Sequence, residues 1–295
     1  MSRALAAGLG IDTFAPRLSF FFAAHSDLFE EVAKFRAARR IYARLMRERF
    51  GASDASCRLR FHTQTGGVTL TAQQPLTNVV RVTVQTLAAV LGGTQSLHTN
   101  GYDEALALPT VDAATLALRT QQVVAFESGV AGTADPLAGS YYVESLTNAL
   151  EERALALLAR VEEMGGAARA IEEGFFQEEI GRSAYEHQLR VERGETIVVG
   201  VNAFTDDEPP LAIPAPDFRA LEQDQLKRLA KTKSLRDERA VASALSALGA
   251  ASASGVAEIS ARLMPLIIDA ARARATIGEI ADTLASAWGM YRPGR

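Results

Sequence analysis

Residues 58–67, Arg-Leu-Arg-Phe-His-Thr-Gln-Thr-Gly-Gly, carry the pattern that decides the fold. A short strand-forming run ends on polar residues and leads through a glycine pair into a helical pattern at about 75–91. The same order occurs on both sides of it, with strand candidates at 18–22 and 95–100, and a further helical pattern at about 111–127. Such alternation is typical of parallel strands joined by helical crossovers. The sequence therefore predicts an α/β fold with three successive β/α units.

Three β/α units are too few to close a barrel, which needs eight parallel strands and typically about 250 residues. We therefore expect residues 1–130 to form part of a TIM (β/α)8 barrel, completed by another polypeptide or left as a fragment. Its outer strands would leave edges unpaired and expose rings such as Phe20 and Phe22. We predict an isolated chain that associates or packs loosely.

The remainder of the chain has a mainly helical pattern. Residues 131–205 predict a helical extension of the barrel domain, with a strong helix at about 144–163 and an isolated strand candidate at 197–201. Prolines at 209, 210, 214 and 216 predict an extended linker over 206–217.

Residues 218–295 predict a C-terminal helical region. Two long helical patterns occur there, at about 218–248 and about 256–288. A small-residue stretch, Ala-Ser-Ala-Ser-Gly at 251–255, separates them. The chain therefore predicts a partial barrel followed by a helical C-terminal region.

The composition excludes several classes of protein. A net charge of −4, with basic and acidic residues interspersed, argues against a nucleic-acid partner. No apolar run approaches the roughly 20 residues of a membrane-spanning helix, and the N-terminus does not resemble a signal peptide. Cys57 is the only cysteine, so an internal disulfide and a multi-cysteine metal site are excluded. We expect a cytoplasmic protein without a membrane partner.

Polar side chains gather where each predicted strand ends. In a β/α barrel this end of the strands forms the active-site mouth, so the residues are expected to converge. The alternative is that they cap helices and bind loop backbone; three strands in register favour the functional interpretation. The residues are His25 after the first strand, His62, Thr63, Gln64 and Thr65 in the second, and His98, Thr99, Asn100 and Glu104 after the third.

No motif predicts a bound metal or nucleotide. None of the four histidines stands in a short metal-binding pattern, and no Gly-x-Gly-x-x-Gly, Walker-type loop or Gly-x-Ser-x-Gly elbow occurs. Arg17 opens the first strand together with Ser19. Its guanidinium is suited equally to binding a phosphate or carboxylate and to a salt bridge at the barrel rim.

Eight stretches resemble the large-subunit barrel of adenosylcobalamin-dependent acyl-CoA mutases of the methylmalonyl-CoA mutase type. The resemblance covers nearly the whole chain, and the nonapeptide at 92–100 is highly specific. The stretches are APRLSFFF (15–22), AKFRAARR (33–40), HTQTGG (62–67), GGTQSLHTN (92–100), DEALALPT (103–110), ADPLAGSYY (134–142), EEMGG (162–166) and VVGVN (198–202).

The resemblance implies a fold and a mechanism. In that family the barrel threads the CoA arm along its axis, and cobalamin caps one mouth from a separate flavodoxin-like domain. A deoxyadenosyl radical abstracts hydrogen from the substrate, whose carbon skeleton then rearranges. By this resemblance the chain is part of an isomerase that interconverts methylmalonyl-CoA and succinyl-CoA or a related acyl-CoA pair.

The resemblance also assigns roles to residues of this chain. His62 and Gln64 would be catalytic, lining the reaction cavity. Residues bound to the substrate would be Arg17, Ser19, Gln64 and Ser96. Residues beside the cofactor would be His98, Asn100 and Glu104.

Departures from the family pattern imply partners. By the resemblance Met1 falls before the sixth barrel strand, so the acyl-reading residues and a Tyr-His pair are missing, as is the Asp-x-His-x-x-Gly motif that ligates cobalt. We expect a partner with the N-terminal barrel half, a separate cobalamin-binding small subunit, and no activity of the chain alone. The stretch 22–27 and Val68 look nearer to isobutyryl-type or two-subunit relatives. The alternative is a truncated, non-catalytic remnant or interaction module.

Overall fold

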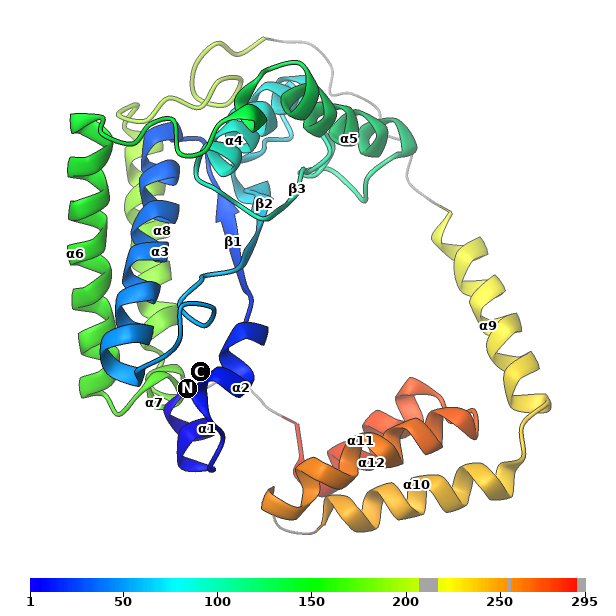
Figure 1. Cartoon of the computed structure of the whole chain (residues 1–295). Coiled ribbons are helices and arrows are strands. Elements are labelled where there is room, and N and C mark those ends of the chain that lie inside the picture. The colour runs from blue at the N-terminus through cyan, green and yellow to red at the C-terminus, as the bar shows by residue number, and fades with distance from the viewer. Residues whose placement is uncertain (207–216, 254–255, 291–295) are drawn as a thin grey trace. The chain divides into compact units, whose positions relative to one another are not determined.

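The computed structural model describes residues 1–206, 217–253 and 256–290 (Figure 1). The chain divides into two compact units, Met1–Ala215 and Pro216–Arg295. Within the described part, no helix combines the length and the apolar character needed to cross a membrane.

The first unit opens with short helices and then alternates strands with helices. Its strands form a parallel sheet in the order β1-β2-β3, which confirms the three predicted β/α units. The elements are α1 (Ser2–Ala6), α2 (Ile11–Phe14), η1 (Ala15–Arg17), β1 (Phe20–Ala24), α3 (Leu28–Phe50), β2 (Phe61–Thr65), η2 (Gly67–Thr69), η3 (Pro75–Thr77), α4 (Asn78–Leu91), β3 (Ser96–His98), α5 (Val111–Phe126), η4 (Val130–Gly132), α6 (Tyr141–Glu163), α7 (Ala167–Glu172) and α8 (Phe175–Glu192).

Strand β1 begins two residues later than predicted. The expected strand at 18–22 is found at Phe20–Ala24, because the three residues before Leu18 form a turn of 3-10 helix, η1, with a proline in its first turn. The Leu18 N–H closes that turn on the Ala15 carbonyl at 3.0 Å. Proline fixes φ near the helical value, which favours such a turn over an extended chain.

The other two strands are shorter than predicted. Strand β2, expected over 58–65, pairs only from Phe61 onward, where β1 first offers a partner residue. Strand β3, expected over 95–100, ends before Asn100. The Asn100 N–H donates to the Thr65 hydroxyl at 2.9 Å instead of joining the ladder. Side-chain bonds of this kind compete with strand pairing.

One face of the sheet is packed against helices. The ring of Phe35, on α3, is fully buried and stacks on Phe61 with centroids 5.2 Å apart. Phe22 meets Phe61 edge-on at 5.3 Å, and Phe20 meets Tyr42 edge-on at 5.3 Å. Aromatic pairs in these geometries add to the stabilisation from burial. The expectation that Phe20 and Phe22 would be exposed is therefore wrong.

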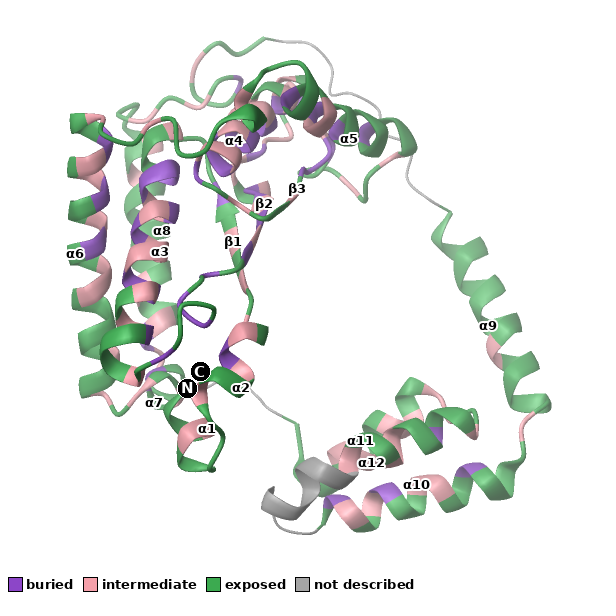
Figure 2. Cartoon of the chain, in the orientation of Figure 1, coloured by how far each residue is buried: buried purple, intermediate pink, exposed green. Residues whose placement is uncertain are grey.

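The opposite face of the sheet is uncovered within the described residues (Figure 2). Successive strand residues point to opposite faces, so Phe21 lies there and is 64% exposed. The outer edges of β1 and β3 have no strand partner in the described part of the chain. The exposed phenylalanine ring of this sheet is thus Phe21.

The single cysteine lies in the core beneath the covered face. Cys57 is buried and unpaired, and its thiol lies 3.7 Å from the Ala52 carbonyl, in the connection between α3 and β2. It belongs to the same hydrophobic cluster as Phe35 and Phe61. No base adjoins it in the sequence, so its role is structural.

The helices after residue 131 include one that packs along α3. Helix α6 lies against α3 (Figure 1), and arginines of α3 meet carboxylates of α6. Arg36 pairs with Glu144, and Glu151 pairs with Arg40 and, at 2.9 Å, with Arg44. The strand candidate at 197–201 contributes only one isolated bridge, so it is not a strand of the sheet.

The second unit consists of helices that break more often than predicted. Helix α10 contacts both α11 and α12. The predicted helix at 218–248 is two helices, and so is the one at 256–288. The predicted linker at 206–217 lies outside the described residues except at its two ends. The helices are α9 (Phe218–Ser234), α10 (Glu238–Ser252), α11 (Val256–Arg272) and α12 (Ile277–Trp288).

Both breaks coincide with helix caps. Asp237 is the N-cap of α10. Its side chain accepts hydrogen bonds from the N–H groups of Arg239 and Ala240. Arg274 has φ of 68°, which stops a right-handed helix. Thr276 and Glu279 then form a capping box that starts α12.

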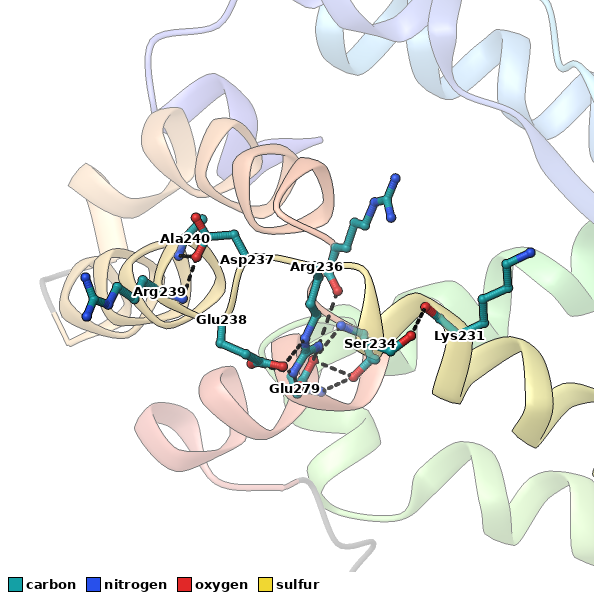
Figure 3. A network of polar contacts seen from close by, with 10 residues as sticks. Lys231, Ser234, Arg236, Asp237, Glu238, Arg239, Ala240 and Glu279 are labelled. Atoms are coloured by element: carbon teal, nitrogen blue, oxygen red, sulfur yellow. Dashed lines mark hydrogen bonds and ion pairs between the residues drawn. The ribbon is translucent and has the colours of Figure 1, made fainter.

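A polar network joins the first break to the second (Figure 3). The Arg236 side chain is only 6% exposed and donates to both carboxylate oxygens of Glu279 at 2.8 Å. It also donates to Glu238 at 2.9 and 3.0 Å. The bonds from Arg236 and from the Thr276 N–H lower the pKa of Glu279 from 4.5 to about 2. The Trp288 indole, at the end of α12, donates to the Ser252 carbonyl, at the end of α10, at 3.0 Å.

Candidate functional site

The uncovered face of the sheet carries four of the candidate residues, His62, Gln64, Ser96 and His98. In the register, Phe21 lies opposite His62, His62 opposite Ser96, and Gln64 opposite His98. Residues paired across parallel strands point to the same face. These five side chains therefore form two rows on the uncovered face, and the alternate strand residues point into the core.

His62 is held by its neighbours on this face. Its Nδ1 lies 2.7 Å from the Ser96 hydroxyl, and its ring lies beside Phe21 with centroids 5.2 Å apart. With Nδ1 engaged by Ser96, Nε2 is the ring nitrogen left for a ligand. The arrangement allows His62 to make one directed hydrogen bond over the uncovered face.

Gln64 and Asn100 join the face to the carboxyl end of the strands. The Gln64 amide donates to the Asn100 side-chain oxygen at 2.8 Å. The Asn100 side-chain amide in turn donates to the Thr65 carbonyl at 3.0 Å. Through these two bonds Asn100, which is 2% exposed, fixes the Gln64 side chain and connects the loop after β3 to β2.

Gly66 and Gly67 allow side chains of neighbouring residues to approach the backbone at this end of the strands. A Cβ on Gly66 would stand 2.6 Å from the His25 ring, and a Cβ on Gly67 would stand 2.9 Å from the Asn100 amide nitrogen and 3.3 Å from a Glu104 carboxylate oxygen. These distances are too short for a side chain. The glycine turn after β2 thus brings His25, Asn100 and Glu104 together.

Arg17 and Ser19 lie at the other end of β1. Both are exposed, and they precede the strand, whereas Asn100 and Glu104 follow the strands. Arg17 forms none of the ion pairs found among the described residues. The sequence-predicted residues therefore form two groups at opposite ends of the strands, with His62 and Gln64 between them.

Two residues of this region were not singled out from the sequence. Phe21 flanks His62 on the uncovered face, and the period-two alternation of strands was the signal that could have found it. Asp103, next to Glu104, is fully buried. A buried carboxylate in a loop has no signature in a single sequence.

The described ranges contain no cluster of three or more histidine, cysteine or acidic side chains placed to hold a metal ion. Exposed polar groups and one aromatic ring dominate the uncovered face instead. The arrangement is suited to orienting an extended ligand by hydrogen bonds along the strands.

Comparison with known proteins decides the family. The family profile described as methylmalonyl-CoA mutase matches residues 1–290. The chain belongs to the methylmalonyl-CoA mutase family. The polar stretches at 62–67 and 92–100 thus occur in a mutase-family sheet, in the parallel order described above.

Three relatives illustrate the similarity. The chain is 50% identical over 287 residues to the 2-hydroxyisobutanoyl-CoA mutase large subunit of Aquincola tertiaricarbonis, covering 97% of this chain and 50% of that protein. It is 46% identical over 289 residues to methylmalonyl-CoA mutase of Rhizobium meliloti (strain 1021), covering 98% and 40%. It is 44% identical over 290 residues to the mitochondrial methylmalonyl-CoA mutase of Homo sapiens, covering 98% and 38%. The chain therefore spans half or less of the length of these mutase-family relatives.

Proposed function

We propose that this chain is a portion of the substrate-binding large subunit of a cobalamin-dependent acyl-CoA mutase. The reaction would be a radical carbon-skeleton isomerisation of methylmalonyl-CoA and succinyl-CoA, or of a related acyl-CoA. The observation that carries the proposal is the uncovered sheet face, which bears His62, Gln64, Ser96 and His98, with Arg17 before β1 and Glu104 after β3. The relatives, all named as acyl-CoA mutases, support this chemistry.

The amino end of the face is the proposed CoA-binding end. Arg17 offers an exposed guanidinium with several donors, which suits an anionic phosphate. Ser19 adds a neutral donor on the strand side. Ser96, in the next row, would contact the substrate closer to its acyl group. The face would thus bind the acyl-CoA lengthwise.

His62 and Gln64 are the proposed catalytic residues in the middle of the face. Both are half-buried and held by side-chain hydrogen bonds to Ser96 and Asn100. Groups held in this way position a reacting acyl group without having to reorganise during the reaction. Their role would be to orient the substrate carbonyl and to exclude water from the reacting atoms.

The carboxyl end of the strands is the proposed cofactor end. His98, Asn100 and Glu104 would lie beside adenosylcobalamin, which supplies the radical chemistry when bound. The residues fit such a group, because Glu104 presents an exposed carboxylate over the side-chain-free Gly67. Carboxylate oxygens accept hydrogen bonds from the hydroxyls of a ribose. Cobalt ligation would come from another domain or subunit.

The proposed partners follow from what the sheet lacks. Residues 1–130 would be the last three β/α units of the barrel, and 131–205 their helical extension. A polypeptide with the N-terminal barrel half would pair with the free strand edges. A small cobalamin-binding subunit would act beside it, and the relative named a large subunit supports this division. The complex would be cytoplasmic, with residues 206–217 linking to the helical region 218–295.

A second candidate is a non-catalytic remnant that serves as an interaction module. The observation that favours it is the length, since the chain spans half or less of its relatives. Reconstitution separates the two candidates. The chain would be mixed with the first half of the Aquincola large subunit, a cobalamin-binding subunit and adenosylcobalamin, and product formation from methylmalonyl-CoA and 2-hydroxyisobutanoyl-CoA would be followed.

We expect turnover by the complex and none by the chain alone. Turnover by the chain alone would show that it needs no second barrel half. An assembled but inactive complex would favour the remnant.

Within the active complex, Gln64→Ala should lower kcat by about 10- to 100-fold, because a positioning contact acts on the reacting geometry. Its stability should change little, since Gln64 is only half-buried. Gln73→Ala, which alters an exposed glutamine outside the sheet, is the matched control. Equal kcat values for the Gln64 variant, the control and the wild type would remove Gln64 from the proposed site.

A further inference from the structure

A fully buried carboxylate lies in the loop that follows β3. Asp103 is 0% exposed. Its Oδ2 accepts from the Thr110 N–H at 2.8 Å and from the Thr110 hydroxyl at 3.1 Å. Its Oδ1 has no hydrogen-bond partner among the described residues. Burying a charged group costs free energy unless it is well bonded, so this carboxylate calls for an explanation.

The loop around Asp103 is fixed at three points. Asn100 bonds to Thr65 at the end of β2. The Tyr102 carbonyl accepts from the Asn78 side chain, on α4, at 2.9 Å. Asp103 then joins the loop to Thr110, the N-cap of α5. Glu104 directly follows Asp103 and lies in the segment that the Asp103–Thr110 bonds close, so its position depends on Asp103.

The charge of Asp103 is compatible with this location. Thr110 bonds to Asp103 and also accepts from the Ala113 N–H at 3.2 Å, in the first turn of α5. A negative charge near a helix N-terminus is stabilised by the helix dipole. Space is provided by Gly101, because a Cβ there would stand 2.6 Å from the Asp103 carboxylate. The buried carboxylate therefore has a site shaped for it.

We propose that Asp103 is a positioning residue for the cofactor end of the face: through Thr110 it holds the loop so that Glu104 stays over Gly67 beside Asn100. This inference rests on the proposed function, which places Glu104 at the cofactor. Two hydrogen bonds to one carboxylate oxygen fix the loop, and the exposed Glu104 side chain is then presented in one place. Asp103 itself touches no ligand.

Asparagine and alanine at this position separate hydrogen bonding from charge. Asp103→Asn keeps an oxygen for both Thr110 donors and changes only the unpartnered oxygen. Asp103→Ala removes both bonds. Hydrogen exchange on the full chain should show amides at 101–110 exchanging at least about tenfold faster in the alanine variant, and near the wild-type rate in the asparagine variant. If the alanine variant does not fold, Thr110→Val, which keeps the backbone donor, should give a smaller rise in the same segment.

The second measurement uses the reconstituted complex. Asp103→Ala should lower kcat at least about tenfold and leave the KM for acyl-CoA unchanged, because Arg17 and Ser19 lie at the other end of the face; Asp103→Asn should restore kcat. Three results would overturn the proposal. The first is an unchanged exchange rate at 101–110 in Asp103→Ala, and the second is an equal effect of Asp103→Asn and Asp103→Ala on exchange or kcat. The third is faster exchange in Asp103→Ala without a loss of kcat. An inactive wild-type complex would count against the proposed function alone, and the exchange measurement would still decide the role of Asp103.

Discussion

The sheet unit and the C-terminal helical unit differ in how their backbone N–H and C=O groups are hydrogen-bonded. Helices form their hydrogen bonds internally, and in the second unit α10 packs against both α11 and α12 while Arg236 ties the two helix breaks together. Strands need neighbours. In the first unit the sheet has helices on one face, an uncovered second face and two edges without partners among the described residues. Helices α10, α11 and α12 therefore pack on one another within the second unit, whereas the sheet has an open face and open edges in the part of the chain that the structure describes.

The largest effect should come from the covered face. Phe35→Ala removes a fully buried ring that contacts Phe22 and Phe61, and such substitutions destabilise by about 3–5 kcal/mol. Urea unfolding followed by circular dichroism would show an early transition, while the fluorescence of Trp288, in the second unit, keeps its midpoint. Phe21→Ala is the matched control, because the same substitution on the uncovered face should cost little. Coincident shifts of both signals would mean that the two units unfold as one.

Hydrogen exchange should separate the strands from one another. Within the described ranges, strand β2 has neighbours on both sides, whereas β1 and β3 each have one. We expect amides of β1 and β3 to exchange at least about tenfold faster than those of β2 in the isolated chain. Uniformly strong protection of all three strands in a monodisperse monomer would show that the sheet is complete as it stands.

Acid should weaken the second unit through Glu279. Its pKa is lowered from 4.5 to about 2 by Arg236 and Thr276. A lowered carboxyl pKa contributes stability above the unfolded value, near pH 4.5, and the contribution is lost as the pH falls towards 2. Glu279→Gln should therefore be less stable than the wild type at pH 7 and similar to it near pH 2, by Trp288 fluorescence. Glu238→Gln, whose side chain is 67% exposed, is the control with a smaller effect. A constant difference between wild type and Glu279→Gln at all pH values would contradict this assignment.

The smallest effect on stability should come from Phe21. Its ring is 64% exposed on the uncovered face, and exposed aromatic rings on an unpaired sheet favour association. Phe21→Ser should leave the unfolding midpoint nearly unchanged and reduce light scattering by the isolated chain. Scattering identical to that of the wild type would show that association does not depend on the Phe21 ring.

The sequence predicted the order and direction of the strands but not their ends. Alternating strand and helix patterns suffice for the order. The ends depend on local hydrogen bonds, such as that of Asn100 with Thr65. The helix breaks near residues 235 and 274 were missed, although Thr276 followed by Glu279 is a capping-box signature that the sequence does display.

The candidate site was predicted by residue type and not by arrangement. Polar residues at strand ends indicated a mouth, and the structure does gather Gln64, Asn100 and Glu104 at one end of the sheet. Arg17 was expected where the first strand opens, and in the structure it lies before β1, at the end opposite to Asn100 and Glu104. The positioning contact of Asp103 links residues seven apart through a loop, which no periodic pattern encodes.

The burial of Cys57 has a practical consequence for work on this chain. As the single thiol, 6% exposed in the core of the first unit, it should react with a maleimide only when that core opens. Trp288, the single indole, belongs to the second unit. The unmodified chain therefore carries one chemical label site and one optical reporter, and each reads a different unit.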